Sequence, residues 1–185
     1  VQAIQTDEAD IVVACGTENM NMLPHYIRKH RFGNKFGHET LEDGLLSIDD
    51  AKTFNRLMIP AIDSRGTISA IHLANDRGEE LMLLRTEDGW RNRRTQADRQ
   101  PGRQQWLIWK DSRTLLREEW QEKSYDNRQR PWYKEAMAGA AGEIRWTDPY
   151  VFLTTGDPGI TVSTRWQDKA GTQWVIALDV MLFDL

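Results

Sequence analysis

The stretch of this sequence that decides the fold is Tyr125-Asp126-Asn127-Arg128-Gln129-Arg130-Pro131-Trp132-Tyr133. Pro131 suits the first position of a helix over 131–138, because its ring fixes φ and the N–H that it lacks would have no partner there. Arg130 then occupies the capping position, where it offers no acceptor to the free N–H groups. A cation beside free N–H groups would hold the carboxylate of a ligand. In the alternative, an acidic side chain of the chain itself, such as Asp126, fills that role.

The last predicted strand, over 172–181, carries the second informative residue, Asp179. Both alternating faces of this strand are apolar, which indicates a central strand that is covered on both sides. A buried aspartate has to be paired or solvated through a cavity, because an unpaired buried charge is costly. The partners that the sequence offers are Arg130, a tyrosine hydroxyl or the ammonium group of a ligand. In the alternative, Asp179 lies in water at a frayed strand end.

Composition narrows the class of protein. The 185 residues carry a net charge of −4, which argues against a general nucleic-acid binder. The single cysteine excludes an internal disulfide and a multi-cysteine metal site. His25, His30 and His38 are not spaced to share a helical face, so we expect no metal site. The chain begins at Val1 and stops on an apolar run, and we read it as a piece of a longer protein.

Hydrophobic periodicity predicts one α+β domain over 47–185, with an antiparallel sheet and helices on one side of it, after an N-terminal helical segment over 1–46. Ser47 or Asp49 caps a helix that Pro60 kinks or ends. The expected strands cover 68–74, 80–84, 105–109, 160–166 and 172–181. The arginine-rich segment 89–103 is predicted to be a solvated polar loop, with a nucleic-acid patch as the alternative. Residues 114–120 form either a strand or a helical turn.

The stretch 125–133 resembles the Cache family in combination with three later segments. These segments are Trp146-Thr147-Asp148-Pro149-Tyr150, Ile160-Thr161-Val162-Ser163 and Val175-Ile176-Ala177-Leu178-Asp179. Cache domains are extracytoplasmic, PAS-like sensor domains of bacterial chemoreceptors, histidine kinases and diguanylate cyclases. The resemblance covers residues 47–185 and rests mainly on those after 104.

The resemblance implies a PAS-like antiparallel sheet packed on a long N-terminal helix, with a ligand pocket on the opposite sheet face. The chain would be the membrane-distal module of a double-Cache sensor, in the periplasmic part of an inner-membrane protein. Its partner would be a small amino acid, amine or carboxylate, and not nucleic acid. We expect no catalytic residue, metal or cofactor, because phosphate-binding, nucleophile-elbow and zinc-ligand motifs are missing from the sequence.

The amino-acid-binding members of the family form the pocket from a tyrosine, an Arg-x-Trp-Tyr group and a late aspartate. The positions that this pattern assigns here are Tyr125, Arg130, Trp132, Tyr133, Tyr150 and Asp179. By resemblance, Arg130 and the indole N–H of Trp132 would hold the ligand carboxylate, and Asp179 with tyrosine groups would hold its ammonium. Phe152 lines the same pocket but stands where the pattern has a second aspartate, which opens the site to other amines or to carboxylates. The rival interpretation is a degenerate module that dimerises through its N-terminal helix and binds nothing small.

Overall fold

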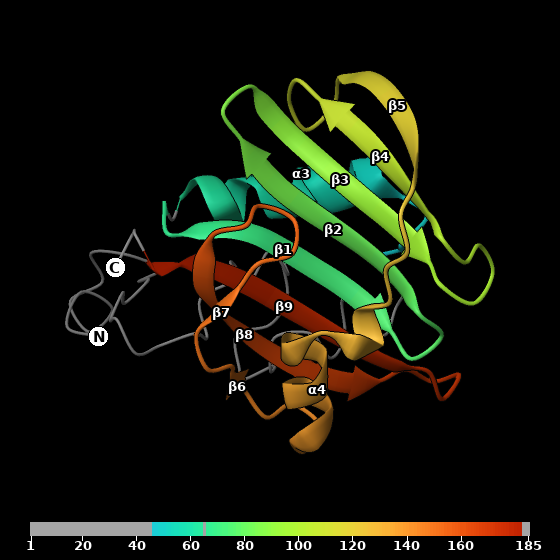
Figure 1. Cartoon of the computed structure of the whole chain (residues 1–185), viewed down its shortest axis with the longest axis vertical. Coiled ribbons are helices and arrows are strands. Elements are labelled where there is room, and N and C mark those ends of the chain that lie inside the picture. The colour runs from blue at the N-terminus through green and yellow to red at the C-terminus, as the bar shows by residue number, and fades with distance from the viewer. Residues whose placement is uncertain (1–45, 65, 183–185) are drawn as a thin grey trace, which may run out of the picture. The chain divides into compact units, whose positions relative to one another are not determined.

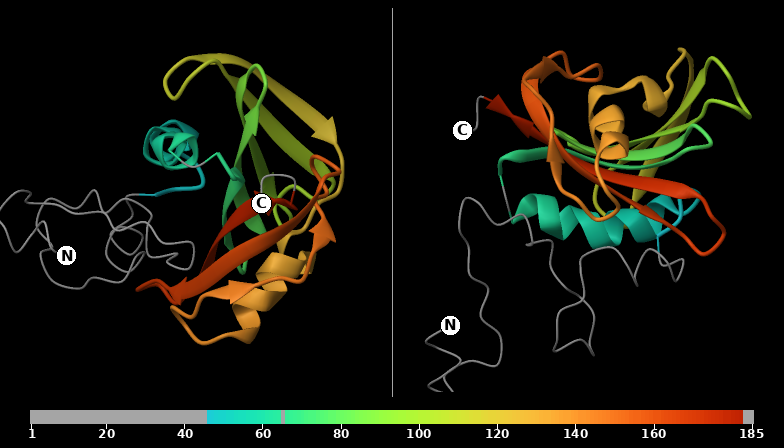
Figure 2. Two further views of the ribbon diagram at one scale, coloured as in Figure 1. Left: turned by 90° about the vertical axis from the view of Figure 1, so that its left-hand side faces the viewer. Right: turned by 90° about the horizontal axis from the view of Figure 1, so that it is seen from below.

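The structure, a computed structural model, describes residues 46–64 and 66–182, which belong to one compact unit. In this part of the chain, nine antiparallel strands form one sheet, with helix α3 (Ala51–Asp63) on one face and helix α4 (Pro131–Ala138) on the other (Figures 1 and 2). The predicted α+β class is confirmed, whereas the expectation of helices on one side is wrong. The early histidines and almost all of the segment 1–46 lie outside the described residues.

The strand order places the chain's last strand in the middle of the sheet. The order is β5-β4-β3-β2-β1-β9-β8-β6, and β7 pairs with β8. The strands are β1 (Ile68–Asn75), β2 (Glu79–Thr86), β3 (Gly89–Gln96), β4 (Arg103–Trp109), β5 (Leu115–Glu122), β6 (Arg145–Trp146), β7 (Tyr150–Val151), β8 (Pro158–Gln167) and β9 (Gln173–Met181). Because β9 lies between β1 and β8, the prediction of a central strand that carries Asp179 is confirmed.

Helix α3 (Ala51–Asp63) buries an apolar stripe against the sheet that includes Phe54, Met58 and Ile62. Its N-cap is Asp50, whose carboxylate accepts a hydrogen bond from the Thr53 N–H at 3.0 Å. The two predicted caps, Ser47 and Asp49, both precede this residue. The helix continues through Pro60 to Asp63 and is therefore 13 residues long.

Strand β3 contradicts the prediction of a polar loop over 89–103. It pairs with β2 over its whole length and with β4 from Trp90 to Thr95, and several of its polar side chains have specific partners. Asn92 exchanges two hydrogen bonds of 2.9 Å with Asn55 of α3, and Arg94 donates to the Ile48 carbonyl. Periodicity cannot recognise such a strand, because hydrogen bonds rather than apolar contacts satisfy its buried side chains.

The register of the strands puts two sets of side chains on opposite faces. Asn92, Leu83, Ile71 and Leu178 are successive cross-strand partners on the face of α3. The intervening residues point to the other face, where Trp132 of α4 packs in a cluster with Ala74, Val175 and Ala177. The neighbours of those apolar residues on this second face include His72, Glu80 and Asp179, and they form the site described next.

Candidate functional site

A buried histidine stands at the centre of a charged cluster on the face of the sheet away from α3. His72 lies on β1 and is 4% exposed. Its Nδ1 lies 2.7 Å from Oε1 of Glu80 on β2, and its Nε2 lies 3.0 Å from Oδ2 of Asp179 on β9. Each ring nitrogen therefore faces a carboxylate oxygen. This geometry suits an imidazolium, because only the protonated ring donates from both nitrogens.

The second carboxylate, Glu80, is completely buried and is held by two further groups. Arg93 of β3 approaches it with Nη2 at 3.1 Å from Oε2 and 3.3 Å from Oε1. The hydroxyl of Tyr125 donates to Oε1 at 3.1 Å. The Arg93 guanidinium also lies over the Tyr125 ring, 3.8 Å from its centroid. Glu80 thus connects the histidine to the first residue of the stretch 125–133.

Electrostatics within the cluster favour the charged form of each of these groups. Burial alone would lower the pKa of His72, but the charges and hydrogen bonds of Asp179 and Glu80 outweigh it and raise that pKa to about 9. Burial raises the pKa of Glu80, but the Arg93 charge and the His72 hydrogen bond together bring it below its usual value. At neutral pH His72 and Glu80 are therefore both charged, and Arg93, whose pKa is raised by the Glu80 charge against the effect of burial, is the second cation of the cluster.

Asp179 has both oxygens engaged by the protein. Besides the bond from His72, the Thr161 hydroxyl of β8 donates to its Oδ1 at 2.6 Å. The hydroxyl of Tyr150 lies 2.7 Å from the same Thr161 oxygen, so Tyr150 contacts Asp179 only through the threonine. The alternative of a frayed end in water is wrong, because Asp179 is 6% exposed. Its partners are His72 and Thr161, neither of which was among the candidates that the sequence suggested.

Arg130 keeps its side chain without an acceptor among the described residues. It precedes helix α4 (Pro131–Ala138) as its N-cap and makes no side-chain capping bond. The alternative that Asp126 serves as its partner is wrong, because Asp126 binds Arg128 through Nε and Nη2 at 2.9 Å each. Arg130 as a residue is half-buried. Burial raises the pKa values of Tyr125 and Tyr150, and the Arg130 charge acts to lower both.

The two aromatic residues that follow Pro131 differ in what they face. Trp132 is 1% exposed, and its ring lies 5.0 Å from the ring of His72, so it covers the cluster. Tyr133 contacts Trp132 edge-on, but its hydroxyl has no hydrogen-bond partner among the described residues. Burial raises the pKa of Tyr133 to about 12, and the charges that act on it are those of Asp76, Arg128 and Asp126. The Tyr133 hydroxyl is therefore not bonded to the cluster.

Phe152 forms an apolar wall beside Tyr150. The two rings meet edge-on at 5.2 Å, and Phe152 is 5% exposed. It lies so close to Gly159 of β8 that a Cβ at that position would overlap the ring. Glycine is thus required opposite Phe152, and the phenyl group fills the space that the side chain of residue 159 would take.

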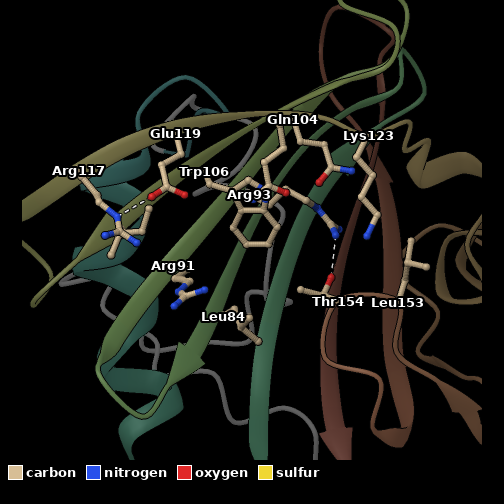
Figure 3. A pocket seen from close by; sticks show the side chains of 12 residues that line it. Leu84, Arg91, Arg93, Gln104, Trp106, Arg117, Glu119, Lys123, Leu153 and Thr154 are labelled. Carbon is tan, nitrogen blue, oxygen red and sulfur yellow. Dashed lines mark hydrogen bonds and ion pairs between the residues drawn. The ribbon is translucent and has the colours of Figure 1, made fainter.

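A hollow of about 230 Å³ lies next to the cluster, over strands β2 to β5 (Figure 3). Its lining includes Arg91, Arg93, Trp106 and Thr154, and none of the seven residues predicted from the sequence is among its lining. Arg93 joins the two places, because it binds Glu80 on one side and donates to the Thr154 hydroxyl at 2.7 Å on the other. Buried N–H groups of Arg93 (Nε) and Trp106 (Nε1) have no acceptor in the described part of the chain.

Four residues of the cluster were not predicted from the sequence: His72, Glu80, Arg93 and Thr161. A signal for two of them existed, because His72 lies in the middle of the apolar segment 68–74 and Glu80 opens the next strand. The argument that a charge on a buried strand needs a partner applies to both. Arg93 lacked such a signal, because its strand has no apolar pattern.

Among residues 46–64 and 66–182, no group of three or more His, Cys, Asp or Glu side chains is arranged to hold a metal ion. Within the same residues, no helix has the length and apolar character needed to cross a membrane.

Comparison with known sequences gives short matches. No family model matches the chain. The chemotaxis protein McpB of Bacillus subtilis is 47% identical over 58 residues, which are 31% of this chain and 8% of McpB. An acetyl-CoA acetyltransferase of Schizosaccharomyces pombe is 56% identical over 45 residues, 24% of this chain and 11% of that enzyme. The chain thus spans about a tenth of these relatives, and such short matches assign no activity.

Comparison with solved structures covers more of the chain. The ligand-binding domain of the Campylobacter jejuni chemoreceptor Tlp3, in complex with L-norvaline, matches 77% of this chain and 44% of its own length, with a TM-score of 0.50 and 14% identity. The complex of the same domain with L-valine gives a TM-score of 0.50 and 15% identity, over 77% of this chain and 45% of that one. At this identity the likeness concerns the fold. The chain therefore has the fold of a Cache-type sensor domain, as the resemblance of its sequence predicts.

Proposed function

We propose that this chain is the extracytoplasmic ligand-binding sensor domain of a bacterial membrane signalling protein and that Arg130 binds the carboxylate of a small ligand. The observation that carries the proposal is a half-buried arginine with no side-chain acceptor among the described residues, whose charge acts on two phenols that are bonded to a buried polar cluster. The fold of a chemoreceptor sensor domain supports the signalling part of the proposal.

The ligand in this proposal meets five side chains. The Arg130 guanidinium binds the carboxylate through charge-assisted hydrogen bonds, and the Trp132 indole N–H adds another. The hydroxyls of Tyr125 and Tyr150 are each bonded to a member of the cluster, and the Arg130 charge acts on both phenols. Phe152 limits the size of the ligand as an apolar wall. Signalling requires that the ligand bind two conformations of the domain with different affinities.

The rival interpretation, a dimerisation module without a small ligand, predicts that the Phe152 and Trp132 side chains fill the pocket and that Arg130 pairs with Asp179. Both aromatic side chains are buried, as it predicts, but the described residues contain no ion pair between Arg130 and Asp179. Asp179 is satisfied by His72 and Thr161 instead. The charge of Arg130 is thus left for a ligand, and this favours the sensor over the purely structural module.

We expect Arg130→Ala to weaken carboxylate binding about 10- to 100-fold, because a charge-assisted hydrogen bond contributes about 1.5–3 kcal/mol. A thermal-shift screen of amino acids, amines and carboxylates first identifies a ligand, and isothermal titration calorimetry then gives its affinity for each variant. The matched control is Arg91→Ala. Arg91 is exposed, lines the neighbouring hollow, and has no ion pair in the described part of the chain.

The ligand screen and the two arginine variants together separate three outcomes. A loss in Arg130→Ala with an unchanged Arg91→Ala supports the proposed site. A loss in Arg91→Ala alone would move the ligand to the hollow and overturn the role of Arg130. If no compound of the three classes stabilises the wild-type protein, the small-ligand sensor is wrong and the dimerisation module becomes the better account.

A further inference from the structure

We infer that the ligand of this domain is a small carboxylate without an α-ammonium group, because the side chain of His72 already occupies the cation position at Asp179. This inference rests on the proposed function and narrows its ligand class. It concerns the part of the site that an amino acid would fill with its ammonium and that this chain fills with its own imidazole.

The carboxylate of Asp179 already has a buried partner on each oxygen. Its Oδ2 lies 3.0 Å from Nε2 of His72, and its Oδ1 accepts the Thr161 hydroxyl at 2.6 Å. Both bonds are buried, and the aspartate is 6% exposed. An incoming ammonium would have to share the single negative charge of Asp179 with the His72 imidazolium, and it would have to lose its own hydration to reach this buried carboxylate.

His72 is fixed in this position from three sides. Glu80 receives the opposite ring nitrogen at 2.7 Å and is itself held by Arg93 and Tyr125. The ring of Trp132 lies over the imidazole with 5.0 Å between centroids. A rotation of His72 away from Asp179 would break the bond to Glu80 as well, so the imidazole is a built-in counter-ion rather than a side chain that a ligand displaces.

The charge balance of the site also disfavours an ammonium group. The carboxylates of Glu80 and Asp179 are matched by the cations of His72 and Arg93. Arg130, whose charge acts on Tyr125 and Tyr150, adds one further positive charge, so a ligand that carries one negative charge would balance the site. A zwitterion would add a positive charge among three cations, and like charges at close range repel in a partly desolvated site. Phe152, an apolar side chain beside Tyr150, offers no acceptor in compensation.

The test compares ligand pairs that share a carbon skeleton and differ in the amino group. L-Norvaline is compared with pentanoate and L-valine with 3-methylbutanoate, by titration calorimetry on the 185-residue chain at neutral pH. We expect each carboxylate to bind at least tenfold tighter than its amino acid. An equal or tighter affinity for the amino acids, with binding still dependent on Arg130, would overturn this inference and leave the proposed function intact. If all four compounds fail to bind, along with the rest of the screen, the proposed function fails and the inference with it.

A variant and a spectroscopic measurement test the role of His72 itself. In His72→Gln, Asp179 loses its cation, so the preference for the carboxylate is expected to shrink at least tenfold or to reverse. An unchanged preference in a folded His72→Gln protein would contradict the inference. Nitrogen NMR of the wild-type imidazole needs no variant: we expect both ring nitrogens of His72 to carry protons at neutral pH, and a neutral ring would refute a built-in cation.

Discussion

Replacement of Glu80 by glutamine is expected to lower the free energy of unfolding by about 3–5 kcal/mol, because it removes one partner of a fully buried ion cluster. Glu80 is completely buried and neutralises both His72 and Arg93. The amide of glutamine preserves the shape but not the charge, so Arg93 remains buried with too little negative charge around it. Urea denaturation followed by circular dichroism measures the difference.

The matched control for Glu80→Gln is Glu122→Gln at the edge of the sheet. Glu122 pairs with Arg103 at 3.3 Å, but its side chain is 83% exposed. Exposed pairs contribute little, so we expect a change within about 0.5 kcal/mol. Similar losses in the two variants would show that burial of the Glu80 cluster has no special weight and would contradict the description of the site.

The free energy of unfolding is also expected to fall by about 3 kcal/mol as the pH rises from about 6.5 to above 9, because of His72. The ordinary pKa of histidine is 6.5, and in the folded protein the carboxylates of Asp179 and Glu80 raise the pKa of His72 to about 9. In this window the folded state holds a proton that the unfolded state has released. The contribution of His72 is therefore complete below pH 6.5 and is lost as the pH passes 9.

The carboxylates act in the opposite direction at low pH. The pKa of Glu80 lies below its ordinary 4.5 in the folded protein, so its contribution is lost as the pH falls below that value. We therefore expect maximal stability between about pH 5 and 6.5. Urea denaturation from pH 4 to 10 checks this, with His72→Gln as the reference. If the wild type and His72→Gln lose stability in parallel above pH 6.5, the raised pKa of His72 is wrong.

Most of the fold follows from the sequence because it depends on local signals. Gly78, with φ of 71°, makes the turn between β1 and β2, and Gly171, with φ of 85°, makes the turn between β8 and β9. A positive φ favours glycine, so both turns have a local signal in the sequence. Pro131 marks the start of α4 in the same way. Helix α4 lies on the face opposite to α3, however, and this depends on the path of the chain from β5 to β6, for which no local residue is a signal.

The candidate site is only partly predictable because its charges satisfy each other across the sheet. Asp179 and Arg130 stand out in the sequence as charges without an evident partner, and the expectation that they are complementary is natural. In the structure Asp179 is paired with His72, which is far from it in the sequence. The two residues meet because β1 and β9 are neighbouring strands, in which Ala70 and His72 of β1 lie opposite Asp179 and Ala177 of β9. Only the strand order brings these residues together, and the sequence does not specify that order.

In the site that we propose, Arg130 holds the carboxylate of a ligand while His72 keeps Asp179 neutralised. The most direct measurement is a crystal structure of the chain grown with the carboxylate that gives the largest thermal shift. We predict density for that carboxylate within hydrogen-bond distance of the Arg130 guanidinium, with His72 still between Glu80 and Asp179. A ligand seated at Arg91 in the hollow, or one whose amino group contacts Asp179 after His72 has turned away, would contradict the account.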